Sequence, residues 1–105
     1  MLKIYGSHMC PDCLACRRNF DHYGIKYEYF DVGDSLSYLH QLIVYRDTLP
    51  IYDECKKVHD IGLPTLVKED GTVFLSWEKY LREQGFDVLP EEPVASACSL
   101  DRKGC

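Results

Sequence analysis

The dipeptide Asp70-Gly71 lies between two apolar runs rich in β-forming residues, at residues 61–67 and 72–75. This pattern is the strongest short-range signal for a β-hairpin, because both residues tolerate the backbone angles of a tight turn. A tight hairpin forces its two strands to pair antiparallel. One antiparallel strand pair is therefore predicted in the C-terminal half of the chain.

The N-terminal half of the chain instead joins two strands through a helix. Apolar positions alternate with other residues in residues 1–5, and β-forming residues dominate again at about residues 26–31. Between them, Pro11 suits the first turn of a helix over about residues 11–23, which Gly24 is expected to close. Strands that are joined through a helix run parallel, so this half predicts a parallel pair.

Helices are also predicted for the remaining segments. One follows Asp34 or Ser35, either of which can cap it, and another covers about residues 50–59. Ser76 is expected to cap the last helix, over about residues 77–85. The complete order of strand, helix, strand, helix, strand, strand and helix predicts an α/β fold, with a four-stranded mixed sheet flanked by helices.

A chain of 105 residues with 46% hydrophobic residues can build one core but not two. The last twenty residues are rich in proline, glutamate and small polar residues. We therefore expect one folded domain over residues 1–85 and a flexible tail over residues 86–105. Cys98 and Cys105 are expected to be exposed thiols on this tail, and a role of either as an additional resolving thiol is left open.

The formal net charge of −5 disfavours nucleic acids and anionic membranes as partners, because binding to either needs clustered Lys and Arg. The N-terminus carries no apolar targeting segment, and no apolar stretch is long enough to span a bilayer. A cytoplasmic location is therefore expected. We also expect the protein to be a monomer.

Three of the six cysteines lie in the stretch from Cys10 to Cys16, directly after the first strand and at the start of a helix. The thiolate is the reactive form of cysteine, and the N-terminus of a helix stabilises it. In a reducing cytosol, closely spaced cysteines are typical of catalytic or metal sites. Cys10 is therefore predicted to be the nucleophile, and Cys13 the thiol that resolves the mixed disulfide.

Other residues near this motif receive more ordinary interpretations. The Asp12 carboxylate opposes the Cys10 thiolate that the helix dipole favours. Cys16 lies about 120° around the helix from Cys10, so the two cannot share a metal ion, and we expect a buried, inert thiol. We expect His8 to be a solvated loop residue and Trp77 to serve in packing. No metal ligand is predicted.

Residues 1–85 resemble a glutaredoxin-like protein of the thioredoxin superfamily. The resemblance depends on the Cys10-Pro11-Asp12-Cys13 motif after the first strand, on Gly62-Leu63-Pro64-Thr65 before the third, and on the hairpin with its closing helix. It implies a thioredoxin-like fold in which the peptide bond before Pro64 is cis, as only X-Pro bonds readily are, and faces the active cysteines. The backbone of Leu63 would then align the substrate.

The resemblance also implies a function. It identifies the chain as a thiol-disulfide oxidoreductase that reduces disulfides through its dithiol, with no bound cofactor. The expected partner is a disulfide-containing protein or a glutathione mixed disulfide. Substrate contacts are expected at Pro11, Leu63, Pro64 and Ser76, the last at the N-terminus of a helix.

Two alternatives remain open. Positions that bind glutathione in many glutaredoxins carry other residues here, so the electron donor is either glutathione or a reductase of the thioredoxin type. The second alternative concerns the function itself, since the same cysteines could serve an iron–sulfur or metal carrier.

Overall fold

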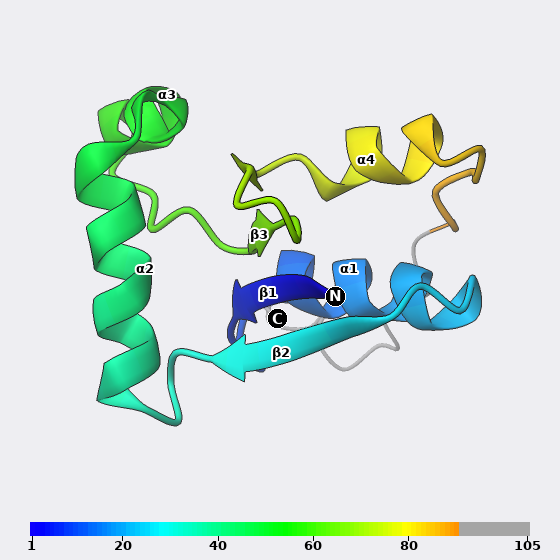
Figure 1. Ribbon diagram of the computed structural model, residues 1–105, viewed down its shortest axis with the longest axis horizontal. Coiled ribbons are helices and arrows are strands. Elements are labelled where there is room, and N and C mark those ends of the chain that lie inside the picture. The colour runs from blue at the N-terminus through cyan, green and yellow to red at the C-terminus, as the bar shows by residue number, and fades with distance from the viewer. Residues whose placement is uncertain (91–105) are drawn as a thin grey trace, which may run out of the picture.

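The computed structural model describes residues 1–90 of the chain (Figure 1). Its elements are β1 (Leu2–Gly6), α1 (Pro11–His22), β2 (Tyr27–Asp31), α2 (Leu36–Thr48), the 3-10 helix η1 (Pro50–Tyr52), α3 (Asp53–Lys57), β3 (Thr65–Val67), β4 (Val73–Phe74) and α4 (Trp77–Glu83). This order confirms the predicted α/β fold of the thioredoxin-like type. The two strands of the hairpin are shorter than the apolar runs that predicted them.

The four strands form one mixed sheet in the order β2-β1-β3-β4. β1 pairs parallel with β2, as expected for strands that α1 connects, whereas β3 pairs antiparallel with both β1 and β4. The prediction of a four-stranded mixed sheet is therefore confirmed.

Helices cover both faces of this sheet. On one face, Ile4 and Leu66 pack with Phe20 of α1 and Leu81 of α4 in the larger core cluster. Side chains alternate along a strand, so Tyr5, next to Ile4, faces the other side. There a smaller cluster joins Tyr5 and Val67 of the sheet to Leu42 of α2, which is fully buried. The sheet thus lies between α1 and α4 on one side and α2 on the other (Figure 1).

The helix ends agree with the predicted caps and stops. The Ser35 hydroxyl accepts hydrogen bonds from the backbone N–H groups of Ser37 and Tyr38, and the Ser76 hydroxyl accepts one from Lys79. These bonds satisfy N–H groups that have no partner within the helix. Gly24 follows α1 with a positive φ of 71°, which a residue without Cβ adopts at little cost.

The predicted helix over residues 50–59 is divided in the structure. Residues 50–52 form the 3-10 helix η1, and α3 covers only Asp53–Lys57. The chain then turns at His59, whose φ of 60° lies in the left-handed region and ends the helical path. The single helix expected here was therefore too long.

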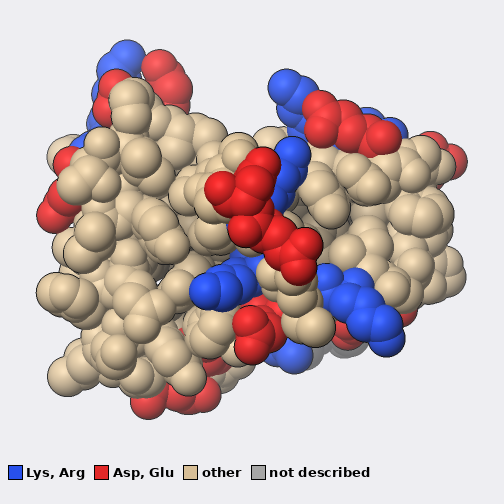
Figure 2. Space-filling model, in the orientation of Figure 1, with Lys and Arg blue, Asp and Glu red and all other residues tan. Residues whose placement is uncertain are grey.

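The surface over α2 carries few charges. On the face drawn in Figure 2, acidic and basic side chains lie interspersed along the middle, whereas the part over α2 at the left is largely uncharged. Leu36, Ile43 and Val44 of this helix are exposed apolar side chains. None of the helices in residues 1–90 has both the length and the apolar character to cross a membrane.

The chain beyond α4 runs back along α1 as far as it is described. Phe86 stacks on Tyr23 with ring centroids 4.4 Å apart, and the Leu89 N–H donates to Asn19 Oδ1 at 2.7 Å. Arg18 donates to the carbonyl of Pro90 at 2.6 Å. Residues 86–90 thus pack against α1. Cys98 and Cys105 lie outside the described residues, where a flexible tail stays a prediction.

Candidate functional site

The strand register brings the predicted site residues to one end of the sheet. Tyr5 pairs with Thr65, so Pro64 lies beside Gly6, just before the loop that leads to Cys10. β3 and β4 pair antiparallel, and their register, followed past the end of β4, brings Ser76 towards Pro64. The loop before Cys10 and the turn at Pro64 thus meet where α1 begins, and the start of α4 lies beyond Pro64 at the same end of the sheet.

Cys10 is the N-cap residue of α1, with extended backbone angles, and its side chain is partly exposed. Its backbone N–H donates to the Ser7 carbonyl at 3.1 Å, which holds the residue at the helix entrance. Pro11 follows as the first helical residue, as predicted, and is exposed. Cys10 therefore lies at a helix N-terminus and is partly exposed to solvent.

Cys13 differs sharply from Cys10 because its side chain is 0% exposed. Burial raises the pKa of the Cys13 thiol to about 12, the neighbouring Cys10 thiol adds to the rise, and a hydrogen bond from the Ser7 backbone N–H to the sulfur partly offsets it. The two thiols are thus neighbours, one partly exposed and one enclosed.

Cys16 belongs to the hydrophobic core, as predicted. It is 0% exposed, packs with Phe20, and has a pKa that burial raises. Within residues 1–90, the three cysteines of the motif do not form a group of metal-ligand type. The group with suitable spacing is His8, Asp31 and Asp34, whose ligand atoms lie within 4.8 Å of one another.

The peptide bond between Leu63 and Pro64 is cis, and Pro64 is fully buried. Two buried hydroxyls form hydrogen bonds with each other and with the backbone next to this turn. The hydroxyls of Tyr52 and Thr65 are 2.7 Å apart, and the Thr65 hydroxyl also donates to the Gly62 carbonyl at 2.7 Å. Sequence reasoning missed Tyr52, because nothing in its local pattern indicates contact with a segment 13 residues away.

Ser76 has a different neighbourhood from the two thiols. It lines a cavity of about 340 Å³ together with Phe74, Lys79 and Ile51, and neither Cys10 nor Cys13 lies on the wall of this cavity. The Ser76 hydroxyl already accepts a hydrogen bond as the cap of α4.

Trp77 does more than the predicted packing. The side chain is 2% exposed and packs against Phe20, but its indole N–H also donates to the Asp12 carboxylate at 3.1 Å. This bond connects the start of α4 to the first turn of α1, across 65 residues of sequence. It orients a negative charge beside Cys10.

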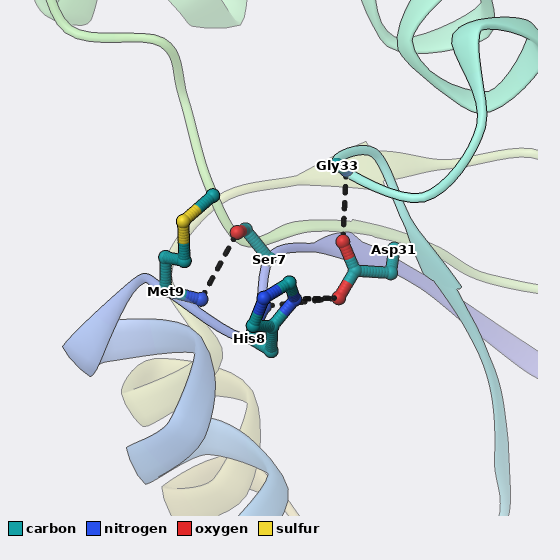
Figure 3. Close-up of polar contacts among 5 residues, drawn as sticks. All are labelled: Ser7, His8, Met9, Asp31 and Gly33. Atoms are coloured by element: carbon teal, nitrogen blue, oxygen red, sulfur yellow. Dashed lines mark hydrogen bonds and ion pairs between the residues drawn. The ribbon is translucent and has the colours of Figure 1, made fainter.

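His8 is exposed to solvent, as predicted, but it is also held in place by hydrogen bonds. Asp31, at the end of β2, accepts a hydrogen bond from the His8 backbone N–H at 3.0 Å, and its carboxylate lies 2.9 Å from His8 Nδ1 (Figure 3). The Met9 N–H donates to the Ser7 hydroxyl at 3.1 Å in the same loop. These bonds fix the loop between β1 and α1 against the end of β2.

The His8–Asp31 pair changes the titration of both groups. The hydrogen bond and charge of Asp31 raise the pKa of His8, and Asp34 adds to this effect. Burial alone would raise the pKa of Asp31, but bonds from the His8 ring and from the N–H groups of Gly33 and His8 lower it overall. Because the parallel register pairs Gly6 with Asp31, the ends of these two strands bring the residues together.

A thioredoxin-like sheet with a Cys-x-x-Cys motif at the start of α1 and a cis-proline before β3 defines the class of this protein. Residues 2–58, more than half of the chain, match the Glutaredoxin family, and the chain belongs to that family. It is also similar to an uncharacterized protein of Haemophilus influenzae (strain Rd). The identity is 29% over 76 residues, which cover 72% of this chain and 88% of the relative.

Proposed function

We propose that this glutaredoxin-family protein is a thiol-disulfide oxidoreductase in which Cys10 attacks the substrate disulfide and Cys13 completes the reduction. The contrast between the two neighbouring thiols carries this proposal. Cys10 is partly exposed at a helix N-terminus, whereas Cys13 is 0% exposed. A bulky substrate can therefore approach the first sulfur, while the second can attack only what is already bonded to Cys10.

The reaction proceeds by two thiol–disulfide exchanges. The Cys10 thiolate attacks one substrate sulfur, forms a mixed disulfide and releases the other sulfur as a thiolate, which takes up a proton. Cys13 then loses its proton and attacks the Cys10 sulfur. The Cys10–Cys13 disulfide forms, and the second substrate sulfur leaves with the electron pair. Two electrons pass to the substrate, and an external donor must return them.

Substrate alignment is assigned to the segments beside Cys10. The backbone of Leu63 at the cis peptide bond and the exposed ring of Pro11 are the proposed contacts, with Pro64 holding the turn. Ser76 would bind substrate at the start of α4. The proximity of Pro64 to the end of β1 supports this assignment.

The electron donor can be identified by supplying each candidate separately. Reduction of a small mixed disulfide of glutathione and of insulin should be measured with glutathione and with a thioredoxin reductase system. We expect turnover with one of these donors, its loss in Cys10→Ser, and its retention in Cys55→Ser, since Cys55 lies in α3 and takes no part in the proposed exchange. Equal activity in Cys10→Ser and wild type would contradict the proposal.

A further inference from the structure

Tyr29 of β2 has a buried hydroxyl that the fold does not use. Its oxygen is inaccessible to solvent and has no hydrogen-bond partner among residues 1–90. The ring itself is fixed, because the Arg17 guanidinium lies over it at 4.0 Å from the centroid. Leaving such a group unpaired costs free energy, so a buried orphan hydroxyl calls for an explanation.

The hydroxyl lies beside the buried thiol of the site. A Cβ at residue 6 would lie 2.6 Å from the Tyr29 hydroxyl oxygen and 3.0 Å from the Cys13 sulfur. Both atoms therefore border the same small space, which exists because residue 6 is Gly6. The oxygen and the sulfur face this space from β2 and α1.

The Cys13 sulfur needs donors when it becomes charged. Burial is the main reason that its thiolate is disfavoured, and a hydrogen bond from the Ser7 backbone partly offsets this effect. Tyr29 is suited to be a second donor because it keeps its proton. Burial raises the pKa of Tyr29, and the neighbouring Cys13 adds to the rise.

We propose that the Tyr29 hydroxyl donates a hydrogen bond to the Cys13 sulfur while that sulfur carries negative charge, and so accelerates the resolving step. This inference rests on the proposed function, because it concerns the second exchange of that reaction. The hydroxyl donates without transferring its proton. The Cys13–Cys10 bond forms, the bond from Cys10 to the substrate sulfur breaks, and the proton lost by Cys13 ends on the departing thiol.

The two exchanges can be timed separately with dithiobis(nitrobenzoate), which releases one coloured thiolate at each step. Attack by Cys10 releases the first, and attack by Cys13 on the mixed disulfide releases the second. The measurement uses the full chain with Cys55, Cys98 and Cys105 replaced by serine. In this background, Cys13→Ser should abolish the second release, which identifies that release as the resolving step.

Tyr29→Phe removes the hydroxyl and keeps the ring. We expect an unchanged first phase and a second phase slowed about tenfold or more, the effect of losing a hydrogen bond to a charged group. The pH profile of the second phase should move about one unit to higher pH. Tyr23→Phe is the matched control, since the Tyr23 hydroxyl donates to the Asp87 carbonyl instead, and both phases should be unchanged.

A second variant separates the hydrogen bond from any effect on folding. Fluorotyrosine at position 29 keeps the ring and has a more acidic hydroxyl, so it should accelerate the second phase. A second phase that is the same in wild type, Tyr29→Phe and the fluorotyrosine protein would overturn the inference and leave the proposed function intact. Absence of the first phase in wild type would instead contradict the proposed function.

Discussion

Asp12 and the N-terminus of α1 act on Cys10 in opposite directions. The partial positive charge of the helix end attracts negative charge on the Cys10 sulfur, whereas the Asp12 carboxylate, held by the indole of Trp77, repels it. The carboxylate is exposed, so solvent and salt reduce its effect. An anionic disulfide such as that of glutathione meets the same negative charge on approach.

Replacement of Asp12 by Asn should therefore make Cys10 more reactive. The amide keeps an acceptor for Trp77 and removes the charge, and the rate of Cys10 alkylation at neutral pH and low salt should rise by a factor of about 2 to 10. Asp47→Asn is the matched control, because it removes one exposed charge from α2. An unchanged rate in Asp12→Asn would show that the carboxylate does not act on Cys10.

The His8–Asp31 pair should make stability depend on pH at both ends of a defined range. The folded-state pKa of His8 is raised above 6.5, so its contribution is complete below that value and is lost as the pH rises through the folded pKa. The folded-state pKa of Asp31 is lowered below 3.8, so its contribution is complete above that value and is lost as the pH falls through the folded pKa.

The stability difference between wild type and His8→Gln should consequently be largest between these two pH values and smaller in alkaline buffer. Urea unfolding of both proteins at about pH 5 and about pH 9 measures it. A difference that is the same at both pH values would mean that the pair contributes through its uncharged hydrogen bonds alone.

At the scale of the elements, the stability of α1 depends on its contacts with the segment that follows α4. Asn19 is buried and connects two backbones, donating to the Ala15 carbonyl and accepting from the Leu89 N–H. Asn19→Ala leaves the Leu89 N–H without this partner and should lower the free energy of unfolding by about 1–3 kcal/mol. Urea unfolding measures this loss.

The matched control for Asn19→Ala is its neighbour Arg18. Its bond to the Pro90 carbonyl is exposed, so water can replace it, and Arg18→Ala should change the free energy by less than about 0.5 kcal/mol. Equal losses of unfolding free energy in the two variants would indicate that the packing of residues 86–90 on α1 does not depend on the buried amide of Asn19.

Sequence reasoning succeeded where the responsible residues are neighbours in the chain. Ser35 and Ser76 cap their helices through N–H groups two or three residues away, a distance that a local pattern describes fully. Sequence reasoning failed for contacts that are formed by the register of two strands. His8 and Asp31 are 23 residues apart and meet because two parallel strands end together, and no local pattern indicates their pairing.

For the same reason, the sequence did not indicate a role for Tyr29. The β-forming residues around it predict a strand, but the orphan hydroxyl becomes meaningful only once Gly6 and Cys13 are placed beside it. The positions of Cys10 and Pro64, in contrast, follow from the sequence, because each lies at the boundary of an element that is itself recognisable.

At the scale of the whole molecule, the fold leaves Cys10 partly exposed and buries its neighbour Cys13. The sheet carries the Cys10 loop, the cis-proline turn and the start of α4 at one end, while α1 directs Cys13 inward. This division of exposure between two adjacent thiols is the physical basis of the proposed two-step reaction.

The most direct test of this division is the mass of the adduct that each cysteine forms with hydroxyethyl disulfide. In a background with Cys55, Cys98 and Cys105 replaced by serine, Cys13→Ser should accumulate one mixed disulfide, and peptide mapping should locate it on Cys10. Cys10→Ser should form no adduct under the same conditions. An adduct on Cys13 in Cys10→Ser, or none on Cys10 in Cys13→Ser, would contradict the account.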